Sequence, residues 1–123
     1  MILVDTSVWI DHLRKGDAML ADLLERGSVL MHPFVMGEIA CGSLNRRSSI
    51  LQLLADLPSA AVAQHAEAMA FVDRYTLHGK GIGYIDVHLL ASTALTLDAR
   101  LWTRDKRLHA AAKEIGNAQT HQY

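Results

Sequence analysis

Hydrophobic residues form three short runs along the chain, and longer stretches with helical spacing separate these runs. Each run consists mainly of large apolar residues bounded by polar residues or glycine, which is typical of a short buried strand. The runs cover residues 2–4, 29–31 and 101–103. Weaker strand patterns occur at residues 60–63, just after Pro58, and at residues 118–120.

The stretches between the runs repeat apolar residues every three or four positions, which predicts helices. Some begin at clear start signals: Asp17 is a favoured N-cap residue, and Pro33 suits the first turn of a helix. The expected helices cover residues 8–15, 18–26, 33–40, 48–57, 65–77, 84–97 and 106–115. The helix at 84–97 is apolar nearly all round, so we expect it to be buried.

Short apolar strands that alternate with helices indicate βαβ units, in which helices cover both faces of a mostly parallel sheet. The length of 123 residues, with no low-complexity linker, fits one domain over residues 1–123. In open sheets of this class, ligands bind outside the carboxyl ends of the strands. The residues that directly follow each strand are therefore the first candidates for chemistry.

Four acidic residues are expected at that edge of the sheet. Asp5 directly follows the first strand, and Asp105 follows the strand at 101–103. Glu38 lies in the helix after the second strand, and Asp86 lies in the first turn of the buried helix. Because a charge among apolar neighbours is costly to bury, Asp86 must be paired, protonated or bound to metal.

Acids that share one rim repel each other, which raises some of their pKa values, and a divalent cation removes that cost. Mg²⁺ and Mn²⁺ favour carboxylate and water oxygens, and two such ions can clamp the reacting oxygens of a phosphodiester. Each acid also has a structural interpretation. Asp5 and Asp105 can cap the helices that follow them, and Glu38 can be a solvated acid. The helix dipole likewise favours an acid at the position of Asp86.

The composition narrows the classes of function. The chain has 12 Lys and Arg, 13 Asp and Glu, a formal net charge of −1 and 50% hydrophobic residues. This balance excludes a disordered chain and a simple polycationic nucleic-acid binder. The single Cys41 excludes a disulfide framework and fits a reducing compartment. No apolar stretch reaches the roughly 20 residues of a membrane span, and the N-terminus lacks a signal peptide, so we expect a cytoplasmic protein.

Four segments resemble the four acidic motifs of the PIN-domain family. They are Asp5-Thr6-Ser7-Val8-Trp9-Ile10, Glu38 after a strand, Ile85-Asp86 at the start of the buried helix, and Leu101-Trp102-Thr103-Arg104-Asp105. Residues 84–92 are especially similar to the third motif of the VapC ribonuclease toxins of toxin–antitoxin pairs. The order and spacing of the motifs extend this resemblance over essentially the whole chain.

The resemblance implies a three-layer α/β/α sandwich and an endoribonuclease that cleaves RNA with Mg²⁺ or Mn²⁺. The implied metal ligands are Asp5, Glu38, Asp86 and Asp105, and the implied supporting hydroxyls are Thr6, Ser7 and Thr103. A homodimer and a cognate antitoxin protein that occludes the active site are also implied. Asp98 competes with Asp105 for the fourth acidic position, and we prefer Asp105 because it directly follows a strand.

Basic residues near these acids are candidate RNA contacts, because a positive border can hold phosphates around an acidic centre. The candidates are Arg46, Lys80, Arg104 and Arg107, and a role as exposed solubilising charge is equally consistent with each. Trp9 is expected in the core or at a dimer contact, and Cys41 is expected to be a buried, inert thiol. Apart from His88, the histidines, His32 among them, are expected at the surface.

The leading hypothesis is therefore a metal-dependent endoribonuclease. The alternatives are a PIN-like module that binds RNA or a protein without cutting, and a stand-alone housekeeping ribonuclease. An enzyme that forms an acyl phosphate on Asp5 is disfavoured, because the residue two positions on is Ser7 and not a second acid.

Overall fold

A parallel sheet lies at the centre of the computed structural model, which describes residues 1–119. Its strands are β1 (Ile2–Val4), β2 (Val29–Leu30) and β3 (Arg100–Trp102), in the order β2-β1-β3. Ile2 of β1 is paired with Val29 on one side and with Arg100 on the other. Because all three strands are parallel, their carboxyl ends meet at one edge of the sheet, as predicted.

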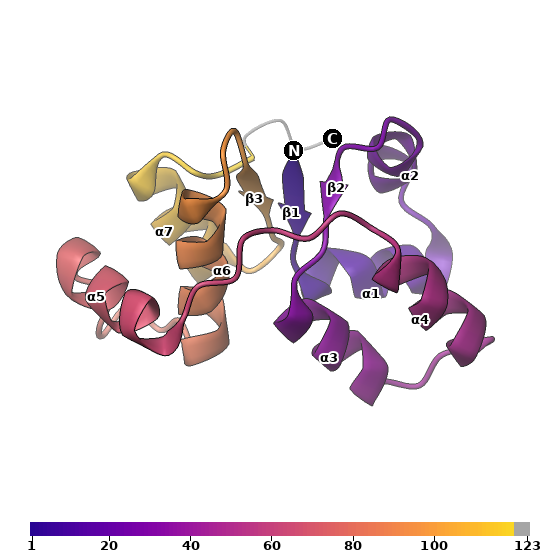
Figure 1. Ribbon diagram of the computed structural model, residues 1–123, viewed down its shortest axis with the longest axis horizontal. Helices are drawn as coiled ribbons and strands as arrows, with labels where there is room; N and C mark the ends of the chain where they lie inside the picture. Colours follow the sequence, from indigo (N-terminus) through magenta and orange to yellow (C-terminus); the bar gives the residue numbers. More distant parts are fainter. Residues whose placement is uncertain (120–123) are drawn as a thin grey trace.

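Seven helices among residues 1–119 surround the sheet. They are α1 (Thr6–Lys15), α2 (Ala18–Glu25), α3 (Pro33–Cys41), α4 (Arg47–Ala55), α5 (His65–Tyr75), α6 (Tyr84–Leu95) and α7 (Lys106–Ile115). In Figure 1, α5, α6 and α7 gather beside β3, whereas α1 to α4 gather beside β1 and β2. The predicted α/β sandwich is confirmed. No helix in the described part has both the length and the apolar character that a membrane span requires.

Three helices end two residues earlier than their apolar pattern predicts: α4 at Ala55, α5 at Tyr75 and α6 at Leu95. α5 ends at Tyr75 because Thr76 adopts a left-handed conformation with φ 52°, and the apolar Leu77 is buried outside the helix. α6 ends at Leu95, and Leu97 beyond it is 86% exposed. An apolar residue therefore extends the sequence pattern without extending the helix.

One isolated bridge lies just before the weaker strand candidate at 60–63, and another lies within the candidate at 118–120. Met31 pairs with Ser59, and Leu101 pairs with Ala118. The prediction of a strand at 60–63 is wrong. Ala60 donates its N–H to the carbonyl of Met31 at 2.9 Å, but beyond it the N–H groups turn to side chains of α6 and of Thr96, its C-cap residue. Ala61 donates to Thr96 Oγ1 at 2.9 Å, and Ala63 donates to the Ser92 hydroxyl at 3.1 Å. Of the candidate at 118–120, residue 120 lies outside the described residues.

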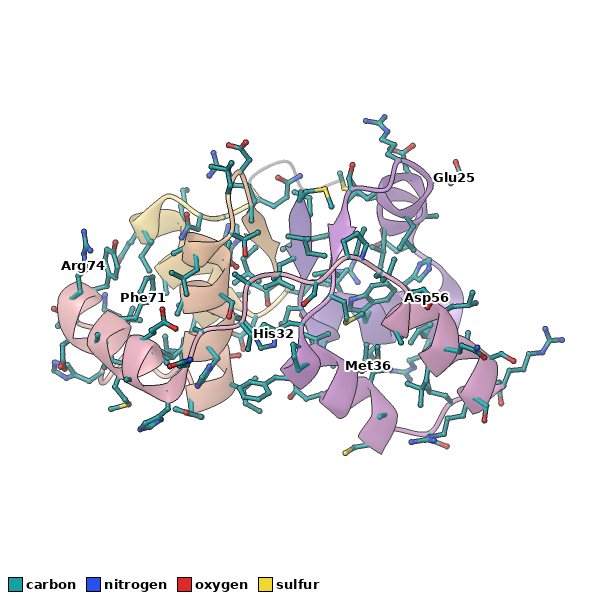
Figure 2. The ribbon with its side chains drawn as sticks, viewed as in Figure 1. Glu25, His32, Met36, Asp56, Phe71 and Arg74 are labelled. Carbon is teal, nitrogen blue, oxygen red and sulfur yellow. The ribbon has the colours of Figure 1, made fainter. Side chains whose placement is uncertain are left out.

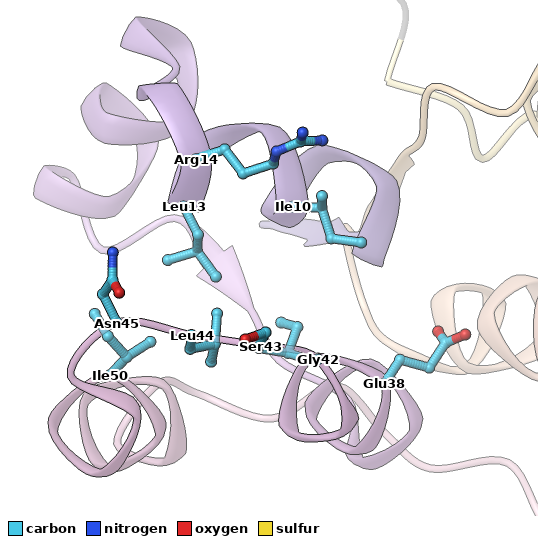
Figure 3. A pocket seen from close by; sticks show the side chains of 10 residues that line it. Ile10, Leu13, Arg14, Glu38, Gly42, Ser43, Leu44, Asn45 and Ile50 are labelled. Carbon is cyan, nitrogen blue, oxygen red and sulfur yellow. The ribbon is translucent and has the colours of Figure 1, made fainter.

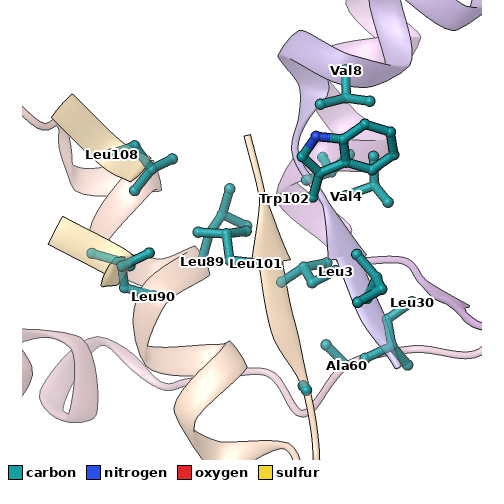
Figure 4. Packing of buried hydrophobic residues seen from close by; sticks show 14 of the residues in the cluster. Leu3, Val4, Val8, Leu30, Ala60, Leu89, Leu90, Leu101, Trp102 and Leu108 are labelled. Atoms are coloured by element: carbon teal, nitrogen blue, oxygen red, sulfur yellow. The ribbon is translucent and has the colours of Figure 1, made fainter. Parts of the chain in front are cut away.

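The core fills the space on both faces of the sheet. Figure 4 shows Leu101 beside Leu89 and Leu90 of α6, whereas the next residue of β3, Trp102, lies near Val4 and Val8. This alternation is the period of two that places successive strand residues on opposite faces. Each large side chain buried in this way contributes about 1.5–3 kcal/mol. Together these contacts hold the carboxyl ends of β1 and β3 in a fixed relation.

Two burial predictions are wrong, and one is confirmed. Trp9 is 1% exposed, in the core. His32 is 0% exposed instead of lying at the surface, because both its ring nitrogens have hydrogen-bond partners in the interior. Cys41 is exposed instead of buried. It is the last residue of α3, beyond the core-facing residues Val35 and Ile39.

Candidate active site

Asp5 lies between the ends of β1 and β3, where backbone pairing fixes its position. Its N–H donates to the carbonyl of Trp102 at 2.9 Å, and its side chain is the N-cap of α1. Oδ1 accepts the N–H of Thr6 at 2.8 Å. Oδ2 accepts the hydroxyls of Thr103 at 2.7 Å and Ser7 at 2.9 Å. Asp5 is 7% exposed, so these donors compensate for most of the water that its charge has lost.

Glu38 reaches the same edge of the sheet from α3. Its Oε1 accepts the hydroxyl of Thr6 at 2.8 Å. Thr6 therefore contacts Asp5 through its backbone N–H and Glu38 through its side chain, and it links the two acids across α1 and α3. All three hydroxyls implied as supporting groups, on Thr6, Ser7 and Thr103, donate to an acid of the site.

Asp86 and Asp105 stand in the first turns of their helices. Asp105 is the N-cap of α7 and accepts the N–H of Leu108 at 2.9 Å. Asp86 accepts the N–H of Gly83 at 3.2 Å from the third position of α6. Both acids thus serve the structural role that their positions allow. Since Asp5 also caps α1, the positive ends of three helices meet the acids, which reduces their mutual repulsion.

The other three acids are close enough to Asp86 to affect its protonation. Burial raises the pKa of the Asp86 carboxyl above its usual range, and the N–H of Gly83 only partly opposes this. The negative charges of the other acids raise the pKa of Asp86 further; they are Asp5, Asp105 and Glu38. A bound cation would offset this repulsion and so favour the charged form of Asp86.

The donor set suits a hard divalent cation. Among residues 1–119, hydrogen bonds occupy only one carboxylate oxygen each of Glu38, Asp86 and Asp105. The second oxygen of each is left for a ligand. As they stand, no three acid, His or Cys side chains in the described part converge on one metal position. This arrangement fits Mg²⁺, which keeps several waters and takes one or two protein carboxylates together with substrate phosphates.

Asp98 does not join this cluster. It lies just before β3, at the opposite end of the strand from Asp105, and its backbone adopts a left-handed conformation with φ 57°. Its carbonyl accepts the N-terminal ammonium group at 3.2 Å. The structure therefore places Asp98 at the amino edge of the sheet and Asp105 at the carboxyl edge.

The candidate RNA contacts are less free than their charges imply. Arg104 pairs with Asp11 and Asp17, and its guanidinium lies over the Trp102 ring, 5.8 Å from the centroid. Lys80 pairs with Glu114 at 3.0 Å.

The other two candidates differ in position. Arg107 of α7 lies against Gly81, in the loop that leads to Asp86, and a Cβ at Gly81 would collide with its side chain. Arg46 is the N-cap residue of α4, in the loop between α3 and α4.

A groove with an apolar lining begins beside Glu38, and the sequence patterns did not reveal it. It has a volume of about 510 Å³ and runs between α1 and the α3–α4 pair. Figure 3 shows Ile10 and Leu13 on one side, Leu44 on the other and Glu38 at one end. Ile10 is 45% exposed. Its apolar character on an exposed face of α1 is the signal that could have indicated the groove.

Known proteins match the chain over nearly its full length. The sequence model of the PIN domain matches residues 2–114. Ribonuclease VapC32 of Mycobacterium tuberculosis is 52% identical over 118 residues, in strain CDC 1551 / Oshkosh and in strain ATCC 25618 / H37Rv alike. The match covers 96% of this chain and 95% of each relative. The chain therefore belongs to the PIN-domain family, among its VapC-type members.

Proposed function

We propose that this chain is an endoribonuclease that hydrolyses RNA phosphodiesters with Mg²⁺ or Mn²⁺, and that it acts as the toxin of a toxin–antitoxin pair. The observation that carries the proposal is the acidic cluster, in which Glu38, Asp86 and Asp105 each keep one oxygen for a ligand. The relatives at 52% identity are named ribonucleases, which supports RNA as the substrate.

The acids of the cluster would bind the cation, and the neighbouring hydroxyls orient the acids. Glu38, Asp86 and Asp105 would hold the cation, directly or through water, and Asp5 would complete the negative site. A divalent cation, when bound, stabilises the charge that develops on the phosphate and activates a water for attack. Thr103 and Ser7 fix the carboxylate of Asp5, and Thr6 fixes that of Glu38. These hydroxyls keep the acids in place before RNA arrives, so little reorganisation is needed.

Cleavage of a labelled RNA tests the proposal, with Asp86→Asn as the variant and Asp98→Asn as the matched control. The control removes an acid at the other end of β3, where asparagine tolerates the left-handed backbone. We expect Mn²⁺-dependent cleavage by the parent and by Asp98→Asn, and its loss in Asp86→Asn or after chelation. RNA binding by the parent without cleavage would favour a non-catalytic module instead.

The groove beside Glu38 supports a protein partner that occludes the site. A partner segment seated between α1 and α4 would end at Glu38 and so would cover the acidic cluster. We expect the product of an adjacent reading frame to co-purify with the parent and not with Ile10→Asp. Cleavage by Ile10→Asp should persist in the presence of that product. If no such partner gene adjoins this one, a stand-alone ribonuclease is the better interpretation.

The resemblance to the family also supports a cytoplasmic homodimer whose single nuclease domain spans residues 1–123. Sedimentation equilibrium measures the mass of the particle directly, against 13.5 kDa for one chain. A mass that stays at one chain over the micromolar range contradicts the dimer.

A further inference from the structure

His32 joins the end of β2 to the start of α3. It is 0% exposed and is the N-cap of α3, where Nδ1 accepts the N–H of Phe34 at 3.0 Å. Its other ring nitrogen, Nε2, lies 3.0 Å from the hydroxyl of Ser92 on α6. Because Nδ1 is an acceptor, the proton of the neutral ring is on Nε2, which donates to Ser92. Figure 2 shows His32 at the start of α3, on the side that faces α6.

Ser92 receives a second donor from another part of the chain. It is 0% exposed, and its hydroxyl oxygen also accepts the N–H of Ala63 at 3.1 Å. One buried hydroxyl therefore connects α6 to the cap of α3 and to the segment before α5. Each of these hydrogen bonds resists displacement, because a shift would leave a buried donor without its acceptor.

This connection spans the two helices that carry acids of the proposed site. Glu38 is on α3, and Asp86 is on α6. Within residues 1–119, no other hydrogen bond joins residues 32–41 to α6. The rings of Phe34 and His88 also meet across this gap, with centroids 4.9 Å apart, but such a contact tolerates sliding more readily than a directed hydrogen bond does.

We propose that His32 is a positioning residue, which fixes Glu38 relative to Asp86 by capping α3 with one ring nitrogen and binding Ser92 of α6 with the other. The effect of His32 on cleavage depends on the proposed nuclease function. The geometry of the connection itself does not depend on that function. Neither His32 nor Ser92 contacts the acids, so their effect on the site passes through the helices.

Two substitutions of His32 separate its two contacts. His32→Asn keeps an acceptor at the distance of Nδ1 and can still cap α3, but it is too short to reach Ser92. His32→Gln reaches the position of Nε2 and keeps the contact with Ser92, but it loses the cap. Ser92→Ala removes the same contact from the other side. Thr93→Val is the matched control, because Thr93 is 1% exposed and its hydroxyl bonds only within α6, to Leu89 at 2.7 Å.

Two measurements are made on each variant. Hydrogen exchange of the α3 amides without metal, normalised to global stability, measures how tightly α3 is held. Calorimetry with Mn²⁺ reads the site. We expect His32→Asn and Ser92→Ala to speed exchange in α3 and to weaken Mn²⁺ binding, each by about tenfold. His32→Gln should retain most of the Mn²⁺ affinity, and Thr93→Val should change neither quantity. The double variant of His32→Asn and Ser92→Ala should lose no more than either single one.

The outcomes distinguish failure of this proposal from failure of the proposed function. If Thr93→Val weakens Mn²⁺ binding as much as His32→Asn does, or if α3 exchange is unchanged in His32→Asn, the positioning role is overturned. If the parent binds no Mn²⁺ but His32→Asn and Ser92→Ala still loosen α3 together, the connection stands and the nuclease proposal fails. Should Ser92→Ala not fold, His32→Asn against His32→Gln still decides the question.

Discussion

Two halves of the acidic cluster are held in place by different means. Asp5 directly follows β1, Asp105 comes three residues after the end of β3, and the N–H of Asp5 pairs with the last residue of β3. Glu38 and Asp86 stand on α3 and α6, and within the described residues the hydrogen bond between the side chains of His32 and Ser92 joins the start of α3 to α6. Backbone pairing fixes Asp5, so we expect the connection between α3 and α6, which side chains make, to be the more easily loosened of the two.

The largest expected effect is loss of cleavage on removal of a charge in either half. Asp5→Asn and Asp86→Asn should each reduce the rate about a thousandfold, since charge stabilisation by the cation is worth several kcal/mol. Their effects on metal-free stability should be opposite in sign. Asp5 loses the donors Thr103 and Ser7, so its variant should melt lower. The raised pKa of Asp86 means that its charge opposes folding at neutral pH, so its variant should melt higher.

Calorimetric melting of the two variants beside the parent checks this contrast. A rise in Tm for both, or a fall for both, would show that the two halves do not differ in how they tolerate charge. Retained cleavage in either variant would remove that acid from the site.

Acidification should loosen the helix-borne half first. Burial lowers the pKa of His32 to about 4, from an ordinary value of 6.5. Between these values the unfolded chain binds more protons than the folded one, so stability is full above about pH 6.5 and falls as the pH falls toward 4. The loss attributable to His32 approaches roughly 3 kcal/mol at pH 4.

Urea unfolding of the parent and of His32→Gln from pH 7 to 4 measures this contribution. The glutamine variant should lack that part of the slope, although it keeps the part that the carboxyl groups cause. Equal slopes for the two proteins would mean that the charged form of His32 is accommodated in the fold.

A smaller effect on cleavage is expected when either of two supporting hydroxyls is removed, and its size should differ between them. Thr103 is 1% exposed and donates to the buried Asp5, whereas Thr6 donates to Glu38, which is exposed. Thr103→Val should reduce cleavage by about 10–100-fold, as is usual for the partner of a metal-site carboxylate. Thr6→Val should cost about tenfold or less, because water can replace the lost donor. Single-turnover rates at saturating Mn²⁺ measure both, and a larger loss in Thr6→Val contradicts the order.

The smallest effect is expected at Arg104, outside both halves. Its pairs with Asp11 and Asp17 are partly exposed, so Arg104→Met should lower the free energy of unfolding by about 1 kcal/mol at most. Because Asp11 and Asp17 already pair with the guanidinium of Arg104, we expect the salt dependence of RNA binding to change little in this variant. Fluorescence anisotropy of a labelled RNA at several salt concentrations measures this. A salt slope lower by about one unit would restore Arg104 as a phosphate contact.

The sequence predicted what local signals determine. The three strands, the start of α3 at Pro33 and both bounds of α7 follow from short apolar runs and capping residues. The edge of the sheet that carries Asp5 and Asp105 followed from strand direction alone. The acids of the site could also be proposed, because Asp5 and Asp105 come soon after strands, Asp86 lies in the first turn of a helix, and Glu38 lies in the helix after the second strand.

Features that depend on distant partners could not be predicted. Nothing near His32 in the sequence indicates Ser92, sixty residues on, so the histidine looked like a surface residue. The segment at 60–63 looked like a strand from its apolar residues, and nothing near it in the sequence indicates that the Thr96 and Ser92 side chains accept the N–H groups of Ala61 and Ala63. Arg104 looked like a free cation because Asp11 and Asp17 meet it only in the folded chain.

The capping role of Asp105 has a practical consequence for capturing the enzyme with its substrate. Asparagine caps helices about as well as aspartate, so Asp105→Asn can keep the bond to the N–H of Leu108 while it removes the charge. Such a variant would be an inactive protein with an unaltered scaffold. It is a natural choice for crystallising a complex with uncleaved RNA, in which the positions of the phosphates could be seen before hydrolysis.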